Sequence, residues 1–288
     1  MFDLPKITPA WTPTETEYRA DPALNFHTLA AFHRDPKAWR DGYFKDVEET
    51  DAMRFGTALH AKILEPTTYN DKVAVFAPPV NPKTGEPYGS TTNAYKDARA
   101  AFDASNAGKT IISAADADLI DALVDAVNFH PVAPTILGRD FRLTELSVKG
   151  VLTVNDVPVE VKGRIDAYTD AGLVDLKTTQ ALADASGRDR FRYTVYDYHY
   201  IAQLAFYRLL LTEFCDVPAT VPCWLIALEK SDPRRVGVYR VDPAVMDKAT
   251  RVVWSWLTEY VTSQTTNVYA SRYDDVQLID RYDAERDL

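Results

Sequence analysis

The sequence predicts an α/β fold, in which a segment of antiparallel strands lies between helical segments. Apolar residues alternate on both sides of Asn155-Asp156, which is typical of a β-hairpin. By contrast, residues 24–64, 92–128 and 196–214 carry apolar residues at helical spacing. At 288 residues, with 46% hydrophobic and 26% charged residues, the chain is long enough for one sizeable globular domain of this kind.

The register of the hairpin follows from its turn. A tight turn centred on Asn155-Asp156 pairs Val154 with Val157. Continuing the same register sets Leu146 opposite Ile165, so that the apolar residues of both strands share one face. The other face is left to the polar residues between them.

Four polar residues gather on that second face. The register sets Glu145 opposite Asp166, and a further turn at 170–172 sets Asp175 across from Asp166. Leu176 joins the apolar face of the hairpin. The expected row on the polar face is therefore Glu145, Asp166, Asp175 and Lys177.

A row of carboxylates favours a metal site. Like charges directly opposite one another destabilise an antiparallel pair, so these three acidic residues call for a cation. Mg²⁺ or Mn²⁺ held by carboxylates can activate a water and stabilise negative charge on a phosphate, and Lys177 would assist the water or that charge. Two alternatives stay open: ordinary polar residues on the wet face of a sheet, or a bulge that shifts the register.

Composition excludes several classes of protein. The net charge is −10 and the sequence pI about 5.0, which argues against a surface coated in basic residues but leaves room for a local basic channel. Cys215 and Cys223 are too few for an iron–sulfur cluster or a four-cysteine zinc site, and are predicted to be buried thiols in a reducing cytoplasm. No apolar run approaches the roughly 18 residues of a membrane span, and residues 1–5 lack the pattern of a secretory signal.

Two helix faces carry further candidates. Gly56 and His60 are four residues apart and share a face, with Gly56 leaving room for a backbone, a metal or a phosphate. His60 is a candidate metal ligand, although a lone histidine is more often structural. Gln203 and Tyr207 also share a face. Their polar ends could hold a catalytic side chain or a phosphate, or Tyr207 could simply pack into the core.

Basic residues alternate with aromatic ones further along the chain. Arg188, Arg190 and Arg192, interleaved with Phe191 and Tyr193, are the best local candidate for contacts to a nucleic-acid backbone and for base stacking. The pair at 234–235 is a second candidate. For both, a solvated loop is the competing interpretation.

These residues resemble the pattern of the PD-(D/E)XK nuclease superfamily, and within it the RecB-like and RecE-like exonucleases of the exodeoxyribonuclease VIII type. The likeness covers about residues 50–210, and a weaker likeness to the RecE type extends upstream to Pro22. The matching segments, in the order of the family, are Gly56-Thr-Ala-Leu-His60, Glu145, Gly163-Arg-Ile-Asp166, Val174-Asp-Leu-Lys-Thr178 and Gln203-Leu-Ala-Phe-Tyr207.

The resemblance implies a fold and a set of roles. The fold is a central mixed β-sheet flanked by helices, with a restriction-endonuclease-like core. Lys177 is the implied catalytic lysine, with Arg164 as a supporting residue near DNA. The implied metal ligands are His60, Asp166, Asp175, the main-chain carbonyl of Leu176 and, as a further acidic member, Glu145.

The domain organisation expected on this basis is simple. A single nuclease domain would comprise a helical part, a catalytic sheet and a C-terminal part with a helix and strands. The expected ranges are 1–22 for an extended lead-in, 23–265 for the domain (23–130, 143–178 and 195–262 for its parts) and 266–288 for a tail.

The expected function is a Mg²⁺- or Mn²⁺-dependent DNA exonuclease that degrades duplex ends, 5′ to 3′, in phage or prophage recombination within a bacterial cytoplasm. Its expected partners are double-stranded DNA ends, a single-strand annealing protein and further copies of the chain in a ring. The two cysteines exclude an iron–sulfur cluster, and the lack of a Gly-rich phosphate loop argues against ATP. The alternatives are a structure-specific or restriction-type endonuclease with the same site, and a catalytically silent module that binds DNA or a partner.

Overall fold

The computed structural model describes residues 5–44, 49–138 and 142–276. Its main sheet has five strands in the order β3-β4-β5-β6-β7. β5 and β6 run parallel and the other neighbours antiparallel, so the sheet is mixed, as the resemblance implied. The strands are β3 (Arg142–Val154), β4 (Val157–Thr169), β5 (Gly172–Thr179), β6 (Cys223–Glu229) and β7 (Val236–Arg240).

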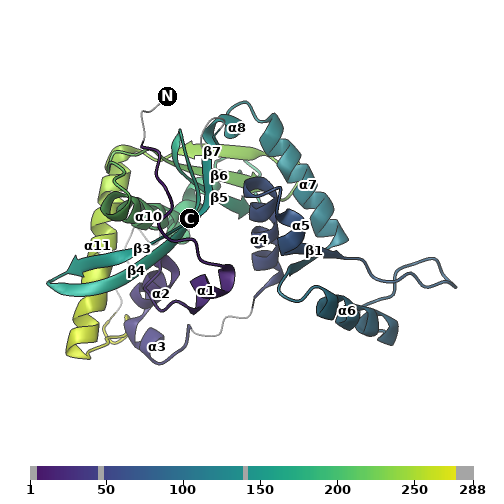
Figure 1. The fold of residues 1–288 in the computed structure, drawn as a ribbon, viewed down its shortest axis with the longest axis horizontal. Coiled ribbons are helices and arrows are strands. Elements are labelled where there is room, and N and C mark those ends of the chain that lie inside the picture. The colour runs from purple at the N-terminus through teal and green to yellow at the C-terminus, as the bar shows by residue number, and fades with distance from the viewer. Residues whose placement is uncertain (1–4, 45–48, 139–141, 277–288) are drawn as a thin grey trace.

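Helices account for most of the remaining described chain, and a short parallel pair of strands lies apart from the main sheet (Figure 1). That pair is β1 (Val73–Phe76) and β2 (Thr110–Ser113). The helices are α1 (Glu15–Ala20), α2 (Phe26–Arg34), α3 (Pro36–Arg40), α4 (Asp51–Leu64), α5 (Tyr69–Lys72), α6 (Asn93–Ser105), α7 (Ala114–Phe129), α8 (Ala133–Ile136), α9 (Phe191–Asp197), α10 (Tyr200–Phe214) and α11 (Pro243–Thr266).

Two apolar cores lie on the two faces of the main sheet. Figure 1 shows α10 and α11 on one side of it and α4 and α7 on the other. The first core, here the α10 core, joins α2, α10 and α11 to sheet residues that include Leu146 and Ile165. The second, here the α4 core, joins α4 and α7 to sheet residues that include Val174 and Leu176. Helices on both faces are what a largely buried mixed sheet requires.

The hairpin of β3 and β4 has the predicted register. Val154 pairs with Val157, and Leu146 pairs with Ile165. The two turn residues, Asn155 and Asp156, have φ values of 49° and 63°. Positive φ at both central residues is the geometry of a type I′ turn, which matches the twist of the two strands. This part of the sequence prediction is confirmed.

Nearer the other end of the hairpin, both strands change face. Leu143 and Leu146, three residues apart, both contact the α10 core, and so do Ile165 and Tyr168. Strict alternation would send one member of each pair to the opposite face. Glu145 lies between the first two with φ of +49°. We call this feature the face reversal; the register itself is kept, because Thr144 still pairs with Ala167.

The face reversal overturns part of the predicted site. The ladder between β4 and β5 ends at Ala167 and Val174, one pair short of Asp166 and Asp175. Leu176 belongs to the α4 core, not to the α10 core that holds Ile165. β4 has changed face at this point and β5 has not. The expectation that Leu176 joins the apolar face of the hairpin is therefore wrong.

Several elements differ from those predicted. Residues 15–20 of the expected lead-in form α1, and the helix expected over 196–214 is divided at His199, which has φ of 55°. The strands β1 and β2 were not predicted. Residues 1–4 of the expected lead-in and 277–288 of the expected tail lie outside the described residues. Within the described chain, no helix has the length and apolar character needed to cross a membrane.

Candidate active site

Helix α4 brings His60 to the sheet. The helix begins after Thr50, whose side chain accepts a hydrogen bond from the Met53 N–H and so caps the helix. Its apolar face, with Leu59 fully buried, packs into the α4 core. Gly56 lies one turn before His60, and a Cβ added there would meet no atom within 4 Å. Packing within the chain therefore does not require a glycine at this position.

Three side chains suited to metal ligation meet at the face reversal. His60 of α4, Glu145 of β3 and Asp166 of β4 each offer an atom, and the three atoms lie within 4.8 Å of one another. His60 Nδ1 is 3.6 Å from Asp166 Oδ2. A non-glycine residue with positive φ costs about 1–2 kcal/mol, and strain of this kind often marks a functional position. At Glu145, it accompanies the change of face next to α4.

A gap between β4 and β5 opens directly beside this group. There the Leu176 N–H donates to Asp166 Oδ2 at 2.7 Å, rather than to a main-chain carbonyl of β4. The N–H and C=O of one strand residue point to the same edge of the strand. The Leu176 carbonyl therefore faces the edge that carries Asp166, which is where the resemblance implied a main-chain ligand.

Asp175 and Lys177 form a buried ion pair. Asp175 is only 1% exposed, and Lys177 Nζ lies 2.6 Å from its Oδ2. Among the described residues, that Oδ2 has no hydrogen-bond partner of good geometry, so the ion pair alone offsets its burial. Both residues alternate with Leu176 along β5, and Lys177 Nζ lies 4.7 Å from the centre of the Tyr200 ring of α10. The pair thus approaches the gap from the α10 side of the sheet.

Burial and crowding of negative charge perturb the carboxyl groups. Burial, with Asp166 adding to it, raises the pKa of Glu145 to about 8. Burial also raises the pKa of Asp175 to about 7, against the opposing charge of Lys177. For Lys177, burial alone would lower the pKa, but Asp175 and Asp166 outweigh it and the pKa is raised. The carboxyl groups therefore resist being ionised together.

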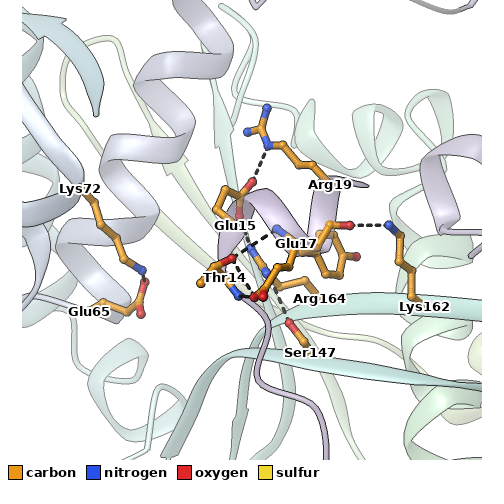
Figure 2. Close-up of polar contacts among 10 residues, drawn as sticks. Thr14, Glu15, Glu17, Arg19, Glu65, Lys72, Ser147, Lys162 and Arg164 are labelled. Carbon is orange, nitrogen blue, oxygen red and sulfur yellow. Dashed lines mark hydrogen bonds and ion pairs between the residues drawn. The ribbon is translucent and has the colours of Figure 1, made fainter. Parts of the chain in front are cut away.

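Arg164 lies beside Glu145 but is held by other parts of the chain. Its Nε donates to Ser147 Oγ at 3.1 Å, and its guanidinium carbon lies 4.1 Å from the centre of the Tyr18 ring. Figure 2 shows Glu15 of α1 meeting Arg164 in an ion pair. The predicted supporting residue thus has protein partners in this structure, and contact with DNA stays a prediction.

The two candidates on α10 support the interpretation that Tyr207 packs into the core, and a role in holding a catalytic side chain or a phosphate stays a prediction. Gln203 Nε2 donates to the Tyr207 hydroxyl at 3.1 Å, and both side chains are buried. The Tyr207 ring packs so closely on β4 that a Cβ at Gly163 would lie 3.1 Å from it. Burial raises the pKa of Tyr207 well above its usual range, with Asp175 and Asp166 contributing. The ring is therefore part of the core, and its surroundings include the acidic site.

Arg188, Arg190 and Arg192 are exposed and belong to the loop before α9 and to its start. Arg188 pairs with Asp184 at 3.0 Å, and Arg192 pairs with Asp189 at 3.1 Å. A contact between these arginines and nucleic acid stays a prediction.

Sequence reasoning missed two residues near the site. Tyr200 lies against Lys177, and a continuous helix over 196–214 gave it no special place. Desolvation lowers the pKa of His27 of α2, and the charge of Lys177 lowers it further, although the residue is exposed. The run of tyrosines that ends at Tyr200 was an available signal. For His27, no local pattern separates it from the other histidines.

The neighbouring strand carries a buried carboxylate of a different kind. Glu229 of β6 is 1% exposed and accepts hydrogen bonds from the Leu182 N–H at 3.0 Å and from the Arg235 N–H at 3.2 Å. Arg235 Nε and Nη2 add two more, at 2.7 and 2.8 Å. The hydrogen bond from Arg235 is the largest cause that lowers the pKa of Glu229 to about 2. Arg235, one of the predicted basic pair, therefore has a structural partner.

The residues at the gap fit a divalent cation. Two carboxylates, an imidazole and an adjacent main-chain carbonyl are mainly hard oxygen donors, which suit Mg²⁺ or Mn²⁺. A cation would also offset the burial and the repulsion from Asp166 that together raise the pKa of Glu145. Asp175 is not in the three-residue group, but its charge acts on the same Asp166.

Comparison with known proteins bears on the fold. The family model described as a PDDEXK-like domain of unknown function (DUF3799) matches residues 26–281. The crystal structure of a "Putative exonuclease" from Eubacterium rectale matches with a TM-score of 0.58 and 13% identity, over 96% of this chain and 98% of that one. The structure of SSO0001 matches with a TM-score of only 0.28 and 15% identity, over 61% of this chain and 73% of that one. The comparison with curated proteins gives no match.

Proposed function

The chain belongs to the family of PDDEXK-like domains, within the PD-(D/E)XK nuclease superfamily, and we propose that it is a metal-dependent DNA exonuclease acting on duplex ends. The observation that carries the proposal is the meeting of His60, Glu145 and Asp166 beside the Asp175–Lys177 pair. The putative exonuclease that shares this fold is consistent with it. A 5′ to 3′ polarity and a role in phage or prophage recombination complete the proposal, by the likeness to the RecE type.

In this proposal, His60, Glu145, Asp166 and the Leu176 carbonyl would hold Mg²⁺ or Mn²⁺, with Asp175 as a further acidic ligand. When bound, such a metal lowers the pKa of a water and stabilises negative charge on a phosphate. The Leu176 N–H fixes the orientation of the Asp166 carboxylate at 2.7 Å. This arrangement presets part of the ligand shell, because a hydrogen-bonded carboxylate has little freedom to rotate.

Lys177 supplies the positive charge of the site. Its raised pKa keeps the amine protonated at neutral pH, with Asp175 as its partner at 2.6 Å. A buried ammonium of this kind orients a water or a phosphate oxygen as a hydrogen-bond donor, and stabilises charge that develops on them. We therefore assign Lys177 a role as donor and charge stabiliser.

The test is digestion of linear duplex DNA, labelled at the 5′ or the 3′ end, alongside closed circular DNA, with Mg²⁺, Mn²⁺ or EDTA. We expect metal-dependent loss of the linear substrate alone, with the label released first giving the polarity. Lys177→Ala is the matched control and should not cut. Cutting of circles would make the protein an endonuclease, and intact DNA with both metals would overturn the assignment as a nuclease.

A further inference from the structure

Exposed tyrosines cluster where α9 meets α10. Tyr193, Tyr196 and Tyr198 are 66%, 65% and 66% exposed. Large aromatic side chains favour burial, so three exposed rings within six residues call for an explanation. We call these three residues with Tyr200 the tyrosine platform.

The tyrosine platform is continuous with the candidate active site. His199, in the left-handed conformation with φ of 55°, separates the two helices. The rings of Tyr198 and Tyr200 on either side of it stack, with centroids 5.7 Å apart and planes at 22°. Lys177 Nζ lies 4.7 Å from the centre of the Tyr200 ring. A path therefore leads from the catalytic lysine over a half-buried ring to an exposed one.

We propose that the tyrosine platform binds unpaired bases of the DNA strand that enters or leaves the active site. The inference rests on the proposed nuclease function and adds to it that the substrate is single-stranded next to the scissile phosphate. Stacked rings with an exposed outer member can accept a further flat ring, and every nucleobase offers one. Within a closed duplex only base edges are presented, in the grooves, so apart from the terminal base pair the platform can be used only by a strand whose bases are unpaired.

The surrounding charges suit a phosphate backbone. Arg190 and Arg192 lie just before the tyrosines in sequence. Arg192 forms an ion pair with Asp189, with its own side chain 75% exposed. Exposed ion pairs contribute little stability, about 0–1 kcal/mol. A phosphate can therefore replace the carboxylate at low cost. The contacts from Tyr198 through Tyr200 to Lys177 favour DNA as the occupant, because a protein partner would not require the tyrosines to reach the active site.

The first test measures binding to duplex DNA with a single-stranded thymidine tail and to the same duplex with a blunt end. Fluorescence anisotropy is read with Ca²⁺ in place of Mg²⁺, and a gel confirms that the DNA stays intact. One stacked base contributes about 1–3 kcal/mol, so Tyr198→Ala should weaken binding of the tailed DNA by about 5- to 150-fold. Binding of the blunt duplex should stay within about twofold. Tyr198→Phe, which keeps the ring, should bind both as the wild type does.

A second test locates the base. A tail that carries 5-iodouracil is irradiated on the wild-type protein, and mass spectrometry identifies the crosslinked peptide. A crosslink within 193–200 supports the proposal, and crosslinks found only elsewhere overturn it. Circular dichroism of the variants shows that the fold is kept.

The two proposals fail separately. If no metal supports cleavage but Tyr198→Ala still weakens binding of tailed DNA selectively, the platform stands and hydrolysis falls. If the wild type cuts DNA and Tyr198→Ala binds tailed DNA as tightly as the wild type, the platform is overturned, and the exposed tyrosines become a candidate surface for a protein partner.

Discussion

Two carboxylates with the same exposed fraction have pKa values shifted in opposite directions. Asp175 and Glu229 are each 1% exposed and each has one basic partner. Glu229 accepts four hydrogen bonds from Leu182 and Arg235, and its pKa falls to about 2. Among the described residues, Asp175 Oδ2 has the Lys177 ammonium beside it but no hydrogen-bond partner of good geometry, and burial raises the pKa of Asp175 to about 7.

The difference separates a carboxylate that only stabilises the fold from one whose oxygen can still bind a ligand. A carboxylate whose lone pairs are all satisfied stabilises the fold and has no remaining capacity for a ligand. One that is buried and under-satisfied is costly to the fold, and its oxygen remains available to a cation. The degree of hydrogen bonding therefore separates the two carboxylates, and it is the reason we propose Asp175, and not Glu229, as a metal ligand.

The largest expected effect is on the rate of cleavage, when the Asp175–Lys177 ion pair is replaced by neutral residues. Asp175→Asn combined with Lys177→Met should reduce cleavage of linear DNA by at least about 10²- to 10⁴-fold. The free energy of unfolding should stay the same or rise, because neutral groups of similar size replace a buried ion pair. End-labelled cleavage and urea denaturation measure the two quantities. A large loss of stability in this variant would break the comparison.

Next in size is the loss of the structural carboxylate. Glu229→Gln removes charge-assisted hydrogen bonds and places the NH₂ group of the amide next to the N–H groups of Leu182 and Arg235, which are also donors. It should therefore lower the free energy of unfolding by about 1.5–3 kcal/mol. Cleavage per folded molecule should stay close to that of the wild type. Urea denaturation and an active-fraction assay measure these. A variant that is as stable as the wild type, or that is folded but inactive, would contradict the structural assignment.

The pH dependence of stability should distinguish the two groups by sign. Glu229 has a pKa lowered from 4.5 to about 2, so its contribution is present above pH 4.5 and is lost as the pH falls toward 2. Asp175 has a pKa raised from 3.8 to about 7, so the native state binds the extra proton and stability falls as the pH rises between these values. Unfolding curves in EDTA for the wild type, Asp175→Asn and Glu229→Gln measure both. Parallel curves for the wild type and Asp175→Asn between pH 4 and 7 would argue against the raised pKa.

The smallest effect sharpens the comparison without changing any charge. Gly56→Ala places a methyl group where no atom lies within 4 Å, inside α4. It should raise the free energy of unfolding by about 0.5–1 kcal/mol, because alanine favours a helix over glycine. Cleavage should nevertheless decrease if a DNA backbone approaches this face. A variant that is more stable and fully active would show that Gly56 has no part in the site.

The sequence predicted the regular part of the site and missed its irregular part. Asn155-Asp156 sets a turn of defined geometry, so the register of β3 and β4 could be carried as far as Leu146 and Ile165. The face reversal was left open only as a bulge, because no local signal at Glu145 favours a positive φ, which is costly for a non-glycine residue. The four-residue strands β1 and β2 were missed for a similar reason, since they pair only through contacts between distant segments.

The regular alternation between the face reversal at Glu145 and the turn limits where this hairpin can accept an inserted residue. Side chains alternate with a period of two along a strand, so one residue inserted between Leu146 and Val154 would turn the following apolar residues away from their core. The same insertion at the turn of Asn155 and Asp156, which is exposed, would lengthen a surface loop at little cost. We therefore expect the spacing from the acidic residue to the turn to be fixed, and insertions in this hairpin to be confined to its tip.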